Sequence, residues 1–178
     1  LNAQDAISKG AKIYTNANIQ KVIRKRDNWE VFLNNGEVLY SKVIINASGP
    51  YALDVLNNLI GIQSQKKIRH VQGSHIITEK LYKGEQAYIL QLDDKRIIFL
   101  IPYLDKYTLI GTTDHEVKSY DNPKITDIEK KYLISSVNKF IKNKITEDNI
   151  IWTYSGVRPL VEDLSENASK ITRDYTFE

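Results

Sequence analysis

The sequence predicts a mixed fold in which a small α/β part precedes a larger α+β part, with an antiparallel sheet and flanking helices in the second. A continuous β-branched run, Val43–Ile45, ends in small residues, as strands of open α/β sheets do. From residue 68 onwards, candidate strands are separated by short polar turns, which is typical of antiparallel sheets. The polar stretch 61–67 has the composition of a linker, so we expect two domains, 1–62 and 63–178.

The first part opens with the end of a helix at residues 1–10 and a short strand at residues 11–14. A meander of strands is predicted next, at residues 19–26, 29–33 and 37–40. Asn34-Asn35-Gly36 predicts a tight hairpin between the last two of these strands, because Asn and Gly adopt positive φ at low cost.

The next strand, residues 42–46, is expected to be a parallel strand buried on both faces, because its centre is uninterrupted β-branched sequence. It ends in Asn46-Ala47-Ser48-Gly49-Pro50, whose small side chains would let a ligand approach the backbone. A plain tight turn explains the same residues, and without other support we prefer that interpretation. Pro50 suits the first turn of a helix at residues 51–59.

The second part alternates strands with turns and adds one helix. Thr126 and Glu129 form a capping box, which predicts that a helix begins there. A strand at residues 150–157 follows it, and then a polar loop at 164–169 and an extended segment at 172–177. The earlier strands are predicted at residues 68–78, 86–92, 96–103 and 107–113, with hairpin turns at Asp93-Asp94 and Asp105-Lys106. The apolar face of the helix is expected to comprise Ile128, Tyr132, Leu133, Val137, Phe140 and Ile141.

Composition excludes several classes of function. The 178 residues are 42% hydrophobic and carry a net charge of +3, which suits a folded soluble protein and argues against a nucleic-acid partner. The absence of cysteine excludes disulfides and thiolate metal sites, and it fits a reducing compartment. The longest apolar run, Ile97–Ile101, is far too short to cross a bilayer. Methionine is absent even at position 1, so we expect the chain to be a piece of a longer protein.

The stretch 152–160 predicts a strand that presents a rigidly held cation. Gly156 and Arg158 would share one face, and Gly156 would leave room for a close approach to the backbone. Pro159 biases Arg158 towards an extended conformation, and the planar guanidinium suits a phosphate or a carboxylate. Arg173 lies in a second extended segment. Two structural arginines in ion pairs explain the pattern equally well.

Other chemistries find less support. The three histidines, His70, His75 and His115, lack metal-ligand spacing, so no metal site is predicted. Nucleophile elbows, phosphate loops and dinucleotide fingerprints are absent, so the main pyrophosphate site of any bound nucleotide lies outside this chain. His75 lies in an apolar strand near Gly73 and could exchange a proton near neutral pH, although a hydrogen-bonded core histidine is the commoner case. Residues 111–114 end another strand, and either approach a ligand or form a capped turn.

In combination, these motifs resemble one family, the FAD-dependent glycerol-3-phosphate dehydrogenases, within the larger group of flavin amine and hydroxy-acid oxidases. Each stretch is weak alone, but six in the same order and spacing are specific, and together they cover essentially the whole chain. The matching stretches are Asn46–Pro50, Gly73–Ile76, Ala87–Gln91, Gly111–Asp114, Tyr154–Leu160 and Thr172–Tyr175.

The resemblance implies what each part does. Residues 1–62 would belong to an FAD-binding domain and residues 63–178 to a substrate domain, with the last residues returning to the FAD domain as an alternative. The enzyme would oxidise glycerol 3-phosphate to dihydroxyacetone phosphate by passing a hydride from carbon 2 to flavin N5, and the electrons would go to a membrane quinone. Its location would be cytoplasmic and peripheral, at the inner face of the membrane, and a homodimer is one expected assembly.

The resemblance also implies roles for particular residues. Arg158 and Arg173 would form a phosphate clamp, and His75 would lie at the reacting hydroxyl, polarising it or taking its proton. The residues implied to contact the cofactor are Ile19 near the adenine and Ala47, Ser48 and Gly49 near the flavin.

Two departures from the family pattern matter. Tyr51 stands where the family commonly has tryptophan, which keeps an aromatic ring. The family's amino-terminal dinucleotide fingerprint and its carboxyl-terminal segment are both absent, so we expect the isolated chain to be inactive. Two alternatives stay open: a related flavin oxidase acting on a small amino or hydroxy acid, and a binding domain with no redox role.

Overall fold

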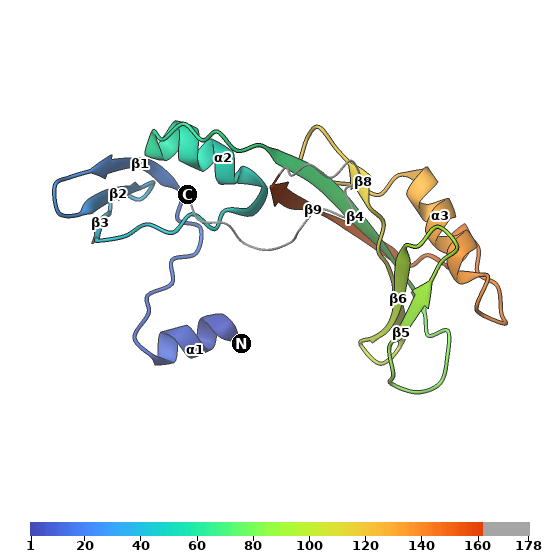
Figure 1. Ribbon diagram of the computed structural model, residues 1–178. Coiled ribbons are helices and arrows are strands. Elements are labelled where there is room, and N and C mark those ends of the chain that lie inside the picture. Colours follow the sequence, from blue (N-terminus) through green and yellow to red (C-terminus); the bar gives the residue numbers. More distant parts are fainter. Residues whose placement is uncertain (162–178) are drawn as a thin grey trace. The chain divides into compact units, whose positions relative to one another are not determined.

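A computed structural model describes residues 1–161 of the chain (Figure 1). The chain divides into two compact units, Leu1–Gln65 and Lys66–Glu178, so the division falls inside the stretch predicted as a linker. The assignment of one unit to a cofactor and the other to a substrate stays a prediction. The extended segment predicted at residues 172–177, which carries Arg173, lies outside the described residues.

The first unit contains a short helix and a meander, as the turn signals predict. Helix α1 (Asn2–Ser8) precedes an antiparallel sheet with the order β1-β2-β3. Gly36, at φ +85°, donates its backbone N–H to Leu33 O at 3.0 Å and closes the predicted hairpin. The bounds of the strands are β1 (Ile19–Arg24), β2 (Trp29–Leu33) and β3 (Val38–Ser41).

Two predicted strands of the first unit are wrong. Residues 11–14 and 42–46 form no strand, and the side chains of Val43 and Ile45 are 70% and 86% exposed instead of buried. A strand forms only where a neighbour supplies hydrogen-bond partners, and among the described residues no strand pairs with either segment. β-branched composition alone therefore predicted a strand that its surroundings do not support.

The predicted helix after Pro50 forms, and it begins at Gly49, two residues before the predicted first residue. A 3₁₀ turn (η1, Gly49–Tyr51) leads into α2 (Ala52–Asp54), and a wider π-helical segment (η2, Val55–Ile60) follows. Pro50 lies in the first turn, where a missing N–H costs nothing. Gly61, at φ +81°, ends the helix in the left-handed conformation that favours glycine.

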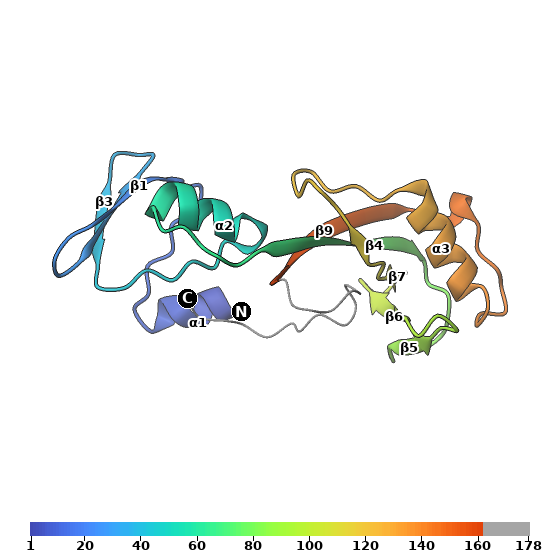
Figure 2. The same cartoon turned by 45° about the horizontal axis from the view of Figure 1, so that its top comes forward.

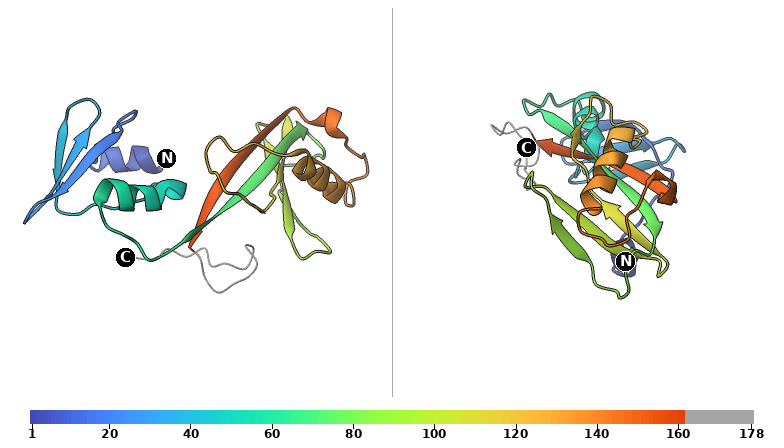
Figure 3. Two further views of the ribbon diagram at one scale, coloured as in Figure 1. Left: turned by 90° about the horizontal axis from the view of Figure 1, so that it is seen from above. Right: turned by 90° about the vertical axis from the view of Figure 1, so that its right-hand side faces the viewer.

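The second unit is built on β4, the longest strand of a six-stranded antiparallel sheet. β9 pairs with β4 over ten residue pairs along one edge, and the two strands run side by side in Figure 3. β7 and β8 pair with successive stretches of the other edge of β4. The strands are β4 (Ile68–Glu79), β5 (Tyr88–Gln91), β6 (Ile97–Tyr103), β7 (Tyr107–Gly111), β8 (His115–Glu116) and β9 (Trp152–Val161).

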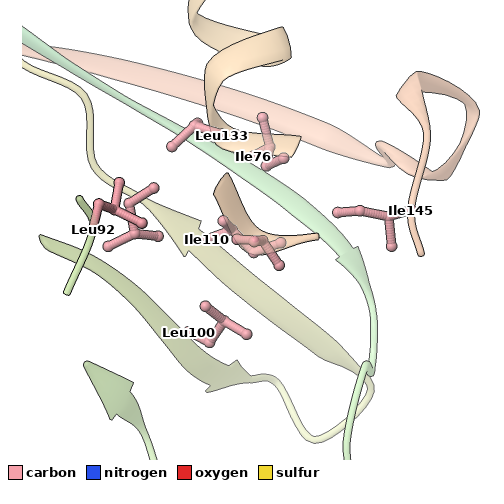
Figure 4. Packing of buried hydrophobic residues seen from close by; sticks show 8 residues of the cluster. Ile76, Leu92, Leu100, Ile110, Leu133 and Ile145 are labelled. Atoms are coloured by element: carbon pink, nitrogen blue, oxygen red, sulfur yellow. The ribbon is translucent and has the colours of Figure 1, made fainter. Parts of the chain in front are cut away.

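Helix α3 (Asp127–Val137) covers one face of this sheet (Figure 2), and a short 3₁₀ turn, η3 (Glu147–Asn149), precedes β9. The predicted capping box is confirmed, because Thr126 Oγ1 accepts from the backbone N–H of Glu129 at 3.2 Å. The core between helix and sheet (Figure 4) consists of Ile76, Leu92, Ile98, Leu100, Ile110, Leu133, Val137 and Ile145. In the described residues, no helix is long and apolar enough to cross a membrane.

Two members of the predicted helical face lie outside this core. Ile128 is 81% exposed and Phe140 is 50% exposed. Ile128 belongs to the first turn, where the buried side chain is Glu129 instead. Phe140 follows the last residue of α3, so helical periodicity no longer fixes its direction.

Candidate active site

β4 separates two environments because successive side chains of a strand point to opposite faces. Ile76 belongs to the core beneath α3, which places the even-numbered residues of β4 on the helix side. Gly73 and His75 therefore lie on the opposite face. In the register of β9, Gly73 is opposite Gly156 and His75 is opposite Tyr154.

Arg158 of β9 lies on the same face, and its guanidinium covers the backbone of Gly73. A Cβ added to Gly73 would lie 2.3 Å from Arg158 Nη1. Nη1 donates to Asp114 Oδ1 at 3.1 Å, and Nη2 donates to Thr112 Oγ1 at 3.1 Å. The side chain of Arg158 is 29% exposed and that of Asp114 is 21% exposed, so the pair is mostly screened from water. Arg158 is thus held in one orientation.

The close approach predicted at Gly156 occurs at Gly73 instead. A Cβ added to Gly156 would meet nothing within 4 Å among the described residues. The guanidinium of Arg158 reaches across to β4, so the glycine that makes room for it is the one on the neighbouring strand. This contact joins two strands that are far apart in the sequence, and the pattern within β9 alone could not predict it.

The substitution Gly73→Ala is expected to lower the stability of the protein by about 1–3 kcal/mol, because the new methyl group displaces Arg158 from Asp114 and Thr112. Gly156→Ala is the matched control, since it makes the same change at the paired position where space is open. Thermal unfolding of both variants checks this. Equal melting temperatures for the two would contradict the tight contact at Gly73.

His75 is held by stacking and by close packing. Its ring lies parallel to that of Tyr154, with centroids 4.6 Å apart, and a Cβ added to Gly111 would lie 2.1 Å from His75 Cδ2. Nδ1 is buried and has no hydrogen-bond partner among the described residues, so a ligand would meet Nε2. Burial and the nearby charge of Arg158 lower the pKa of His75 below its ordinary value of 6.5. The imidazole is therefore neutral near pH 7 and can accept a proton.

The sequence predicts that Arg158 either forms a structural ion pair or binds an anion, and its contacts in the structure are compatible with both. The ion pair with Asp114 exists, as the structural interpretation expects. It occupies one N–H on Nη1, and Thr112 occupies one on Nη2, so further N–H donors of this partly exposed group can still bind an anion. Arg173, the predicted second cation, lies outside the described residues, and its convergence with Arg158 stays a prediction.

Residues 111–114 form what we call the 111–114 corner, which leads from β7 towards β8. It contributes Thr112 and Asp114 to the hydrogen bonds of Arg158. The sequence of this corner predicts either a ligand contact or a capped turn, and nothing in it indicates the partnership with Arg158. Asp114 and Arg158 are 44 residues apart, and no local spacing signals such a pair. Tyr154 was also missed as the stacking partner of His75.

In the first unit, the segment that carries Ala47, Ser48 and Gly49 is a side-chain-stabilised turn. Asn46 Oδ1 accepts from the backbone N–H of Ser48 at 3.3 Å and from Ser48 Oγ at 2.6 Å. Asn46 Nδ2 donates to Ala52 O at 2.8 Å, which ties the turn to the following helix. Gly49 has a φ of +59°, and a Cβ there would meet nothing within 4 Å. The turn therefore presents small residues and open backbone, which fits the approach of a flat ring system.

Two further predictions concern exposed residues and metals. Ile19, the predicted adenine contact, is the first residue of β1 and is 45% exposed. Residues 1–161 contain no group of His, Cys, Asp and Glu side chains arranged to hold a metal ion. His115 lies exposed in the short strand β8, away from the face that carries His75 and Arg158.

Comparison with known proteins places these features in a family. A family model described as FAD dependent oxidoreductase matches residues 1–172. The chain is 42% identical over 183 residues to a glycerol-3-phosphate dehydrogenase of Pseudomonas aeruginosa, covering 99% of this chain and 36% of that protein. It is 38% identical over 187 residues to a D-erythritol 1-phosphate dehydrogenase of Brucella abortus, covering 100% of this chain and 37% of that protein. The chain thus spans little more than a third of the length of these relatives.

A solved structure shows the same fold. The glycerol-3-phosphate dehydrogenase from Bacillus halodurans complexed with FAD superimposes with a TM-score of 0.77 at 24% identity. The match covers 89% of this chain and 34% of that chain. At this identity the superposition supports the fold alone.

Proposed function

The chain belongs to the family of FAD-dependent oxidoreductases, and we propose that it is the central part of a dehydrogenase that oxidises glycerol 3-phosphate to dihydroxyacetone phosphate. The observation that carries this proposal is the placement of a rigidly held guanidinium and a neutral imidazole on one face of the sheet. Such a pair suits a substrate that combines an anionic group with a hydroxyl to be deprotonated. The relatives from Pseudomonas aeruginosa and Brucella abortus are both named as dehydrogenases of phosphorylated polyols, which supports the same substrate class.

Arg158 would bind the phosphate of the substrate. A guanidinium forms paired hydrogen bonds to phosphate oxygens, and here its orientation is fixed by Asp114, Thr112 and the backbone of Gly73. The substrate therefore binds to a group that is already ordered, so little conformational entropy is lost on binding. Arg173 would complete the clamp and balance the second negative charge of the phosphate.

His75 would act at the hydroxyl on carbon 2. Its Nε2 either takes the hydroxyl proton as the hydride leaves carbon 2, or it donates a hydrogen bond that polarises the oxygen. The lowered pKa keeps the ring neutral, which the role of proton acceptor requires. When bound, FAD supplies the acceptor for the hydride. The ring of Tyr154 holds the imidazole in place by stacking.

The first unit would hold the cofactor. Ala47, Ser48 and Gly49 would lie against the flavin, where small residues and open backbone allow close approach, and Ile19 would lie near the adenine. The main pyrophosphate site would belong to the rest of the complete protein. For this reason the isolated chain is expected to be inactive, and the tests below use the complete, flavin-loaded protein.

The proposal extends to the partners of the complete enzyme. Electrons would pass from the reduced cofactor to a membrane quinone, and the enzyme would bind peripherally at the cytoplasmic face of the membrane, with a homodimer as its expected assembly. The family assignment argues against the second alternative from the sequence, a binding domain with no redox role. The open competitor is a flavin oxidase that binds a small amino or hydroxy acid by its carboxylate.

A substrate comparison tests the proposal. The complete protein is expected to reduce a quinone analogue with glycerol 3-phosphate, with kcat/KM at least about a hundredfold above that for glycine or proline, because a rigidly held cation suited to a dianion discriminates strongly. D-Erythritol 1-phosphate serves as a third substrate, because one relative carries that name. A kcat/KM for D-erythritol 1-phosphate above that for glycerol 3-phosphate would make D-erythritol 1-phosphate the substrate. Oxidation of amino acids alone would overturn the proposal.

A further inference from the structure

A buried carboxylate lies directly beneath the proposed site, on the helix side of β4. Glu129 is 6% exposed and belongs to the first turn of α3. Its Oε1 accepts from Ser74 Oγ at 2.7 Å and from Thr113 Oγ1 at 2.6 Å. Its Oε2 accepts from Gln72 Nε2 at 3.1 Å and from the backbone N–H of Thr126 at 2.8 Å. Neither oxygen is left without a donor.

The two carboxylate oxygens of Glu129 have different roles. Oε2 and Thr126 complete the capping box of α3, which is an ordinary role for glutamate at this position. Oε1 is not needed for the cap, and its two short hydrogen bonds connect the helix to β4 and to the 111–114 corner. A glutamate that served only as a cap would be expected at the surface, where the cap is just as effective.

Each residue bound through Oε1 is a sequence neighbour of a site residue. Ser74 precedes His75, and Thr113 lies between Thr112 and Asp114, which hold Arg158. Thr113 Oγ1 also accepts from the backbone N–H of Ser74 at 2.9 Å, so the corner and β4 are joined directly.

The third strand of the site is joined through Ser74. Ser74 Oγ donates to Glu129, so Ser155 Oγ donates to Ser74 Oγ across 2.8 Å. Ser155 lies between Tyr154, which stacks on His75, and Gly156 of β9. One carboxylate thus connects β4, β9 and the 111–114 corner, the elements that carry the site.

We propose that Glu129 is a positioning residue that holds His75, Arg158 and the 111–114 corner in the arrangement needed for substrate binding and proton transfer. The expected effects on kinetics rest on the proposed function. The positioning of the site residues by Glu129 does not depend on that function. Short hydrogen bonds to an ionised group in a buried setting resist displacement strongly. A shift of the corner would move Asp114 and with it the guanidinium, and a shift of β4 would move the imidazole.

Glu129 is ionised in this setting, which the role requires. Burial raises the pKa of its carboxyl, but the hydrogen bonds from Thr113, Ser74 and Thr126 outweigh burial and hold the pKa below its ordinary value. A carboxylate accepts hydrogen bonds at both oxygens, whereas an amide of the same shape places donors against donors. Glu129→Gln therefore perturbs the network with little change in volume.

The test combines that variant with a matched set in the complete, flavin-loaded protein. Thr113→Val keeps the shape of the side chain but removes the hydroxyl, and Thr113→Ser keeps the hydroxyl. Val137→Ala shortens a buried core residue of α3 that is remote from the network, so it reports loss of stability alone. For each variant we would measure flavin content, melting temperature, kcat and KM for glycerol 3-phosphate, and the titration of His75 by NMR, assigned as the resonance lost in His75→Gln.

We expect Glu129→Gln and Thr113→Val to raise KM by at least about tenfold at unchanged flavin content, as loss of a positioned charge contact would. Thr113→Ser should bring KM back towards that of the unchanged protein, and Val137→Ala should lower the melting temperature without raising KM. In Glu129→Gln, the His75 titration should also move up towards 6.5, because the ring and Arg158 separate and the site opens.

If Glu129→Gln behaves like Val137→Ala, with a lower melting temperature but unchanged KM and unchanged His75 titration, the positioning role is overturned. If the unchanged protein oxidises no glycerol 3-phosphate, the proposed function fails instead. In that event the His75 titration alone decides the inference, since it measures the arrangement of the site and requires no turnover.

Discussion

Replacing Arg158 by alanine in the complete, flavin-loaded protein is expected to raise KM for glycerol 3-phosphate by about thirtyfold to several hundredfold. This corresponds to about 2–4 kcal/mol, the typical cost of removing one partner of a hydrogen-bonded, partly buried charge pair. The dianionic phosphate would lose its ordered cation, and Asp114 would be left as an uncompensated negative charge in the same place. Steady-state kinetics at constant ionic strength measure the effect.

Two controls separate charge from geometry. Arg158→Lys keeps the charge but loses the planar fork and the simultaneous hydrogen bonds to Asp114 and Thr112, so it should recover only part of the affinity. Asp114→Asn removes the negative charge near the phosphate but keeps an oxygen that can accept from Arg158, so it should raise KM far less than Arg158→Ala. Unchanged KM in Arg158→Ala would refute the assignment of this residue to the phosphate.

The fold could be predicted where local sequence decides the structure. The hairpin at Gly36, the capping box at Thr126 and the presence of strands β4 and β7 follow from residues within a few positions of each other or from clear alternation, whereas the pairing of β4 with β9 does not. The two predicted strands of the first unit that do not form fail for one physical reason. Val43–Ile45 has strand composition, but a strand requires a neighbour, and the pairing partner is a property of the whole sheet and not of the segment.

In the candidate site, too, local sequence indicates some residues, whereas contacts between distant segments could not be predicted. Arg158 and His75 could be selected from the sequence because residue type, neighbouring glycine or proline, and position in a strand indicate their chemistry. The residues that contact Arg158 and His75 could not be predicted in this way. The contacts of Arg158 with Gly73 and Asp114 depend on the order of strands in the sheet, and the contacts of Glu129 cross from the helix to the sheet. Sequence spacing identified Glu129 only as a helix cap, because that role is local.

Replacing His75 is expected to lower kcat by about 10²–10⁴-fold if it takes the substrate proton, the usual range for a general base. His75→Gln and His75→Asn distinguish this role from simple polarisation. Because Nδ1 is buried, a ligand meets Nε2, and the amide of glutamine reaches nearer to that position than the amide of asparagine. A residue that only donates a hydrogen bond would therefore be partly replaced by glutamine, whereas a base would be replaced by neither.

The pH profile provides an independent check on the same residue. Burial and Arg158 hold the pKa of His75 below 6.5, so the neutral, active form persists below that pH. We therefore expect kcat, measured at saturating substrate so that the phosphate's own titration at about pH 6 does not enter, to fall only as the pH decreases through the lowered pKa. This fall in rate at low pH, the acid limb of the profile, should be absent in His75→Gln. In Arg158→Ala it should move to higher pH, because removal of the neighbouring positive charge raises the pKa of the imidazole. An acid limb that survives in His75→Gln would show that another group titrates and that His75 is not the base.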